Sequence, residues 1–141
     1  MSRPRPTPKI RQLALRLLSY EAAIPSKPPM PAALRVSEKL RRPLSILMGS
    51  SGFRSLLARS LTLAKAVVPG LAAVQVDPDG SLQGWNDMDN EDQADVMVIA
   101  QLLELLVTFI GGGLMRSLVL DAWPDFTLEN DSEKRDDAPT R

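Results

Sequence analysis

The stretch VMVIAQLLELLVTFIGGG, residues 96–113, is the most apolar part of this chain. Before its glycines, the polar side chains are Gln101, Glu104 and Thr108, and their i, i+3, i+7 spacing puts them on one narrow face of a helix. The pattern predicts a helix with a thin polar stripe and a very wide apolar surface. A buried central helix is the favoured interpretation, and an interface between chains is the first alternative.

A membrane-spanning helix is the second alternative, and it fits less well. A span needs about 20 apolar residues, whereas residues 96–110 are fewer and have Glu104 at their centre, where a carboxylate is costly in lipid. The N-terminus is basic but carries no recognisable export signal. We therefore expect a cytoplasmic protein and no membrane partner.

The composition favours helices and excludes several kinds of catalysis. A chain of 141 residues is enough for one domain, and with aromatic residues at 4% its core must be aliphatic, which favours helices over sheets. The chain has no cysteine and no histidine, which excludes thiolate and imidazole metal sites and Ser-His-Asp or Cys-His catalysis. We expect no cofactor and no enzyme activity.

Three further segments have helical periodicity. Residues 9–23 are predicted to form a short basic amphipathic helix. Residues 32–49 are helical in two pieces, with a boundary or kink expected just before Pro43 because proline removes a backbone hydrogen bond. Residues 50–70 give the clearest signal. Their apolar stripe consists of Phe53, Leu56, Leu57, Leu61, Ala64, Val67 and Val68.

The remaining ordered elements follow from turn signals. Residues 71–85 alternate in polarity around Asp77-Pro78-Asp79-Gly80, which predicts a short β-hairpin near residues 72–84 packed on the helices. The run Gly111–Gly113 is expected to stop or kink the apolar helix, which then resumes over residues 114–123.

Together these segments predict a mainly α fold, with four to five helices around an aliphatic core and one short β-hairpin. Residues 1–31 are interpreted as a basic, Pro-rich N-terminal arm that carries the first helix. Residues 32–125 are the helical domain, and residues 126–141 an acidic tail. We expect both charged termini to be disordered because they have little apolar surface to bury.

The formal net charge is zero, but the charges are separated along the chain. Residues 1–65 hold 13 basic and 2 acidic residues, a charge of +11, and residues 66–141 hold 4 basic and 15 acidic residues, a charge of −11. The favoured interpretation is that the two halves neutralise each other on folding. A basic face for nucleic acid or an acidic partner, and head-to-tail self-association, are the alternatives.

One short segment resembles an anion-binding turn. Gly49, Ser50, Ser51 and Gly52, with Arg54 nearby, resemble the backbone nest found at helix N-termini that bind anions. An ordinary capped turn between helices is the alternative, and the pattern favours it. If the chain binds a small anion, this turn is the expected site.

Other candidate motifs fail on their context. The run Gly111–Gly113 lacks the preceding strand and the following Lys-Ser/Thr of a phosphate loop. The acidic residues of 87–95 lack the glycine and glutamate that an EF-hand requires at its sixth and twelfth positions. Glu104 is the acidic residue placed inside a strongly apolar segment, and one carboxylate does not make an active site.

Two stretches carry a resemblance that covers about residues 37–125. They are RRPLSILMGSSGFRSLLARSLTLAKAVVPGLAAVQVDPDGSL and IAQLLELLVTFIGGGLMRSLVLDAWPD. The chain resembles a group of small bacterial helical proteins that share these motifs and have no assigned activity. It departs from the group at Gly112, where an acidic residue is expected. The resemblance implies a compact bacterial domain and no particular chemistry.

The leading hypothesis is a non-enzymatic protein-interaction or regulatory module that binds a protein partner or itself. The alternatives are a nucleic-acid-associated accessory protein that uses the basic half, and a small-anion binder at the turn of residues 49–52. The expected partner surface consists of Arg11, Arg16, Arg41, Arg42, Gln101, Glu104 and Thr108.

Overall fold

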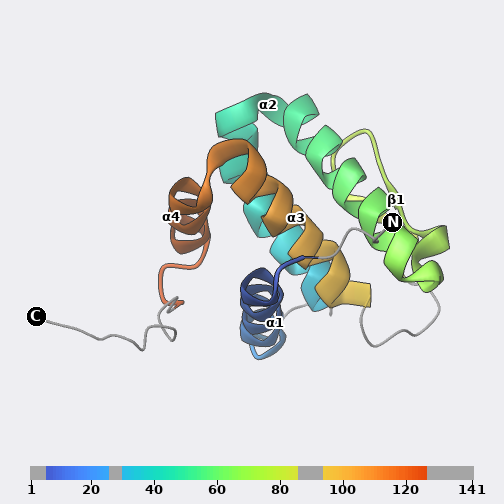
Figure 1. Cartoon of the computed structure of the whole chain (residues 1–141), viewed down its shortest axis with the longest axis horizontal. Helices are drawn as coiled ribbons and strands as arrows, with labels where there is room; N and C mark the ends of the chain where they lie inside the picture. The colour runs from blue at the N-terminus through green and yellow to red at the C-terminus, as the bar shows by residue number, and fades with distance from the viewer. Residues whose placement is uncertain (1–5, 26–29, 86–93, 127–141) are drawn as a thin grey trace, which may run out of the picture.

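The computed structural model describes residues 6–25, 30–85 and 94–126 (Figure 1). Within these ranges the fold is mainly helical with one short hairpin, as predicted. The elements in chain order are α1 (Pro8–Ala22), α2 (Ala32–Val67), a short 3-10 helix η1 (Pro69–Ala73), β1 (Gln75–Val76), β2 (Leu82–Gln83), α3 (Ala94–Ile110) and α4 (Gly112–Ala122).

Helix α3 lies in the middle of the fold and packs against α1, α2 and α4 (Figure 1). Its residues are buried from Ala94 to Leu103 apart from Asp95, which is half-buried. The interpretation of this segment as a core helix is therefore confirmed for most of its length, while Phe109 near its end is 61% exposed. Of the helices in the described ranges, none has the length and apolar character to span a membrane.

Helix α1 belongs to the same core. Its apolar face buries Ala14, Leu17 and Leu18, and the helix contacts both α2 and α3. The predicted N-terminal arm thus contributes its helix to the domain that was predicted to begin at residue 32. At the C-terminal boundary of the predicted domain, Phe126 was assigned to the tail, but it is buried against α1, with its ring edge-to-face against Tyr20 at 5.6 Å between centroids.

Helix α2 bends at Gly49, and the kink predicted just before Pro43 is wrong. The helix runs through Pro43 without a break, whereas Gly49 has φ 83° and ψ 158°. A proline loses one backbone hydrogen bond but keeps a helical φ. A reversal of φ to positive values, which breaks the helical path, is a conformation that glycine adopts freely. The glycine therefore decides where the helix bends.

The hairpin contacts α2 on both sides of this bend. Strands β1 and β2 pair antiparallel with Gln75 opposite Gln83 and Val76 opposite Leu82, so the predicted hairpin is confirmed. The turn between the strands presents two carbonyl oxygens to α2. Arg41, before the bend, donates to the backbone carbonyl oxygen of Asp79 at 2.6 Å. Arg54, after the bend, donates to the backbone carbonyl oxygen of Pro78 at 3.0 Å.

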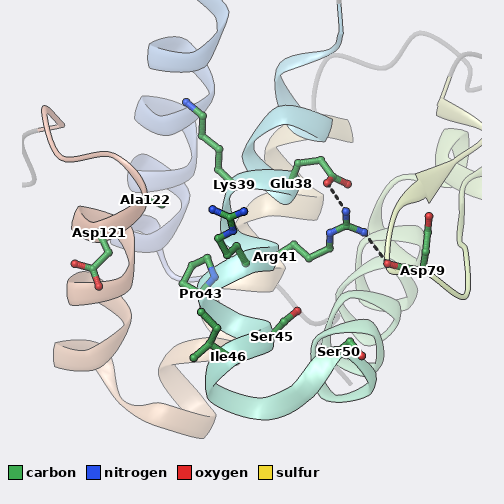
Figure 2. Close-up of a pocket in the computed structure, with 11 residues that line it drawn as sticks. Glu38, Lys39, Arg41, Pro43, Ser45, Ile46, Ser50, Asp79, Asp121 and Ala122 are labelled. Atoms are coloured by element: carbon green, nitrogen blue, oxygen red, sulfur yellow. Dashed lines mark hydrogen bonds and ion pairs between the residues drawn. The ribbon is translucent and has the colours of Figure 1, made fainter.

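The glycine run acts as predicted: α3 ends at Ile110, Gly111 has φ 88°, and α4 begins at the next residue. Figures 1 and 2 both place this α3–α4 turn beside the bend of α2. Predictions about the terminal segments 1–5 and 127–141 and about the acidic segment 86–93 fall outside the described residues.

Candidate functional site

A groove of about 1200 Å³ opens on the surface between the first half of α2 and the end of α4. Figure 2 shows Lys39, Pro43 and Ile46 on α2, with Asp121 and Ala122 on α4 across from them. We call it the α2–α4 groove.

The groove faces outward because of the periodicity of α2. Val36, Leu40 and Leu44 recur every fourth residue and are completely buried, so they define the core-facing side of the helix. Residues placed two positions away from this stripe point in the opposite direction. Ile46 is one of them, and its side chain is 82% exposed at the groove.

Several charges around the groove are paired within the chain. Arg41 forms an ion pair with Glu38 at 3.0 Å, in addition to its bond to the Asp79 carbonyl (Figure 2). Lys39 forms an ion pair with Glu21. Three charged groove residues, Arg42, Asp79 and Asp121, form no ion pair within the described ranges, and all three are exposed. The Asp79 carboxylate accepts two hydrogen bonds from Ser81, so Arg42 and Asp121 are the cation and the anion of the groove that have neither an ion pair nor a hydrogen bond with a described residue.

Below the groove lies a buried carboxylate. Glu21, at the end of α1, is completely buried, and its Oε2 accepts a hydrogen bond from Trp123 Nε1 at 2.6 Å. Arg35 Nε lies 3.1 Å from its Oε1, and Lys39 forms an ion pair with Oε2. Lys39 Nζ also lies 5.9 Å from the centre of the Trp123 ring. This cluster joins α1 and α2 to the residue that follows α4.

Apolar side chains are exposed at the end of the molecule where α2 bends. Ile46 and Leu47 precede the bend, and Phe109 and Leu114 flank the neighbouring α3–α4 turn. All four are exposed. We call these four residues the bend surface. Exposed large apolar side chains that gather in one region are typical of interaction sites.

The residues of the predicted anion turn have different environments in the structure and do not form one site. Gly49 forms the bend and Ser50 lines the groove. The hydroxyls of Ser50 and Ser51 make no hydrogen bond with a described residue, so the expected helix cap is not formed. Arg54 is directed to the hairpin turn instead, where it bonds the Pro78 carbonyl. Gly52 is half-buried against the side chain of Met48.

The predicted partner surface is not one surface. Gln101 is 3% exposed in the core, so its assignment to a surface is wrong. Its helix position is right, but α1 and α2 cover the face on which it lies. Glu104 accepts a hydrogen bond from the backbone N–H of Thr7 at 2.9 Å, and Thr108 donates to the Glu104 carbonyl at 3.1 Å.

The predicted cations also separate. Arg41 and Arg42 line the α2–α4 groove. Arg16 lies over the Phe126 ring, 5.0 Å from its centroid, and lines a different cavity of about 460 Å³ together with Glu104. Arg11, half-buried on α1, lines neither cavity. The basic half therefore uses several of its cations in contacts inside the fold.

Sequence reasoning missed Glu21, Ile46 and Asp121. For Glu21 a signal existed, because it and Glu38 are the acidic residues of a strongly basic half. For Ile46 the signal was its position outside the apolar stripe that includes Leu40 and Leu44, which indicates an exposed side chain. Asp121 had no local signal, since only the packing of α4 beside α2 brings it to the groove.

Asp79 in the hairpin turn supports a pH prediction. The Ser81 hydroxyl donates to its Oδ1 at 2.6 Å and the Ser81 backbone N–H donates at 3.0 Å, and these bonds lower the pKa of Asp79 below its usual 3.8. The folded state thus favours the charged form, so this stabilisation is complete above the unfolded pKa and is lost as the pH falls through the folded pKa.

We expect the carboxyl of Asp79 to titrate below an ordinary aspartate in an NMR pH series, and Ser81→Ala to move its pKa upward. Ser45→Ala, which removes a hydroxyl of α2 that makes no hydrogen bond with Asp79, is the control and should leave the Asp79 titration unchanged. An unchanged Asp79 titration in Ser81→Ala would contradict the assignment.

The described residues contain no group of three acidic side chains that could hold a metal ion. Comparison with protein-family models, curated proteins and solved structures returned no significant match to this chain. The resemblance to small bacterial helical proteins, and the nucleic-acid and anion-binding alternatives, stay predictions.

Proposed function

We propose that this chain is a non-enzymatic protein-interaction module that binds its partner through the bend surface and the adjoining α2–α4 groove. The observation that carries the proposal is the exposure of Ile46. Of the large hydrophobic side chains that the described residues leave exposed, this isoleucine has the highest exposed fraction, 82%, and it lies on a helix whose opposite face is fully buried.

The energetics favour a protein partner for such a surface. Burying one isoleucine or phenylalanine side chain contributes about 1.5–3 kcal/mol, and the bend surface offers four large apolar side chains on three neighbouring helices, α2, α3 and α4. Apolar anchors surrounded by charged groups are typical of the energetic centre of protein interfaces. Here Arg42 and Asp121 provide the surrounding charges.

Ile46→Asp is expected to abolish partner binding without unfolding the protein. Because the side chain is exposed, the free energy of unfolding should change by no more than about 0.5 kcal/mol. Leu15→Asp is the control, since Leu15 is an aliphatic residue that is 36% exposed and lies on α1, outside the bend surface and the groove.

The measurement is quantitative cross-linking in native extract with the wild-type chain and both variants. Cross-linked species present with wild type and Leu15→Asp, and lost with Ile46→Asp, would support the proposal. Equal recovery of the same species with Ile46→Asp would contradict it.

A further inference from the structure

We propose that the partner is a second copy of this chain, bound across a two-fold axis with the α2–α4 grooves facing each other. In this dimer the Ile46 side chains meet near the axis, and Arg42 of each copy pairs with Asp121 of the other. The inference rests on the proposed function, because it names the occupant of the same surface.

The charges of the groove point to this occupant. Arg41 and Lys39 are paired inside the chain and Asp79 is hydrogen-bonded by Ser81, so the charged groove residues without a partner in the described ranges are Arg42 on α2 and Asp121 on α4. A strongly acidic partner would satisfy Arg42 but would place like charge against Asp121, and a strongly basic partner would do the reverse. A surface with one charge of each sign suits a partner that has the same pair.

A two-fold interface demands this kind of self-complementarity. In such an interface, a contact of residue i with residue j is repeated as a contact of j with i. Arg42 of α2 and Asp121 of α4 line the same groove, and Ile46 of α2 lines it too. Rotation about an axis near Ile46 therefore brings each cation toward the opposite anion and buries the isoleucines against one another.

The apolar centre should supply most of the affinity. Exposed ion pairs contribute little and are screened by salt, whereas burial of Ile46 and Leu47 is not. The dimer is therefore expected to persist at high salt. The Arg42–Asp121 pairs would mainly determine which surfaces recognise each other.

Charge reversal tests the pairing directly by sedimentation of the full chain over a concentration series. Wild type should dimerise. Arg42→Asp alone and Asp121→Arg alone should each weaken dimerisation by about tenfold or more, because like charges then face each other at both ends of the interface. An equimolar mixture of the two variants should recover the wild-type affinity, because every pair in the mixed dimer joins opposite charges.

The mixture separates a contact between copies from a contact within one chain. A pair within one chain would be repaired in the double variant but not in the mixture, so a mixture no better than either variant alone would overturn the proposed pairing. Leu15→Asp is the control and should dimerise like wild type.

The failure of this inference is distinguishable from the failure of the proposed function. One outcome is that wild type is a monomer at every concentration, while a different protein cross-links to wild type and not to Ile46→Asp. That result would overturn the proposal that the partner is a second copy, and it would support the proposed interaction surface. If dimers form and persist unchanged in Ile46→Asp, both the inference and the surface on which it rests are wrong.

Discussion

Glu21→Gln is expected to lower the free energy of unfolding by about 3–5 kcal/mol, the usual cost of removing one partner from a buried charged cluster. The carboxylate of Glu21 is completely buried and is contacted by Arg35, Lys39 and the Trp123 indole N–H. The amide has nearly the same shape, so the packing is kept while the charge is lost. Arg35 then loses the anion that compensates its partial burial.

Urea denaturation followed by circular dichroism measures this change. Glu38→Gln is the matched control, because Glu38 forms an ion pair with Arg41 at a partly exposed position, where such pairs contribute about 0–1 kcal/mol. A loss of less than 1 kcal/mol in Glu21→Gln would show that the charge of Glu21 does not hold the cluster together.

Gly84→Ala is expected to destabilise the protein by about 3 kcal/mol or more. Gly84 has φ 84°, a conformation that costs other residues about 1–3 kcal/mol. A Cβ atom here would also fall on the Ala73 carbonyl oxygen, far inside van der Waals contact. Because the obstacle is backbone, relief requires the hairpin to move away from the residues that precede it, which adds about 1–3 kcal/mol.

Gly49→Ala is the control for this substitution. Gly49 has nearly the same φ of 83°, but a Cβ added there meets nothing within 4 Å. Only the conformational cost applies, so Gly84→Ala should be worse by about 1–3 kcal/mol in the same denaturation experiment. Equal losses in the two variants would mean that the contact with Ala73 is relieved without cost.

The elements of this fold could be predicted where the signal lies within a few residues. The helical spacing of α3, its end at Gly111 and the Asp77–Gly80 turn each depend on neighbours in the chain, and each was predicted in its observed place. The bend of α2 was misplaced because two local breakers compete there. Pro43 keeps a helical φ, whereas Gly49 takes a positive one.

The candidate site could be predicted only in part. Arg41 and Arg42 were expected on a partner surface and do line the groove. Gln101 was expected there and is buried, because the polar stripe of α3 lies under neighbouring helices. Whether a polar residue on a helix contacts solvent or another helix depends on what packs over it. The spacing of polar residues along one helix does not show which other helices cover that face.

The sequence by itself determined most of the secondary structure, the aliphatic core and the absence of cysteine and histidine chemistry. Backbone hydrogen bonds and side-chain periodicity act over about four residues, so they can be read from the chain. The tertiary structure decided which residues are buried together and which stay available. Glu21 meets Trp123 across 102 residues, and Arg42 shares a groove with Asp121, because the packing of α1, α2 and α4 around α3 brings distant segments together.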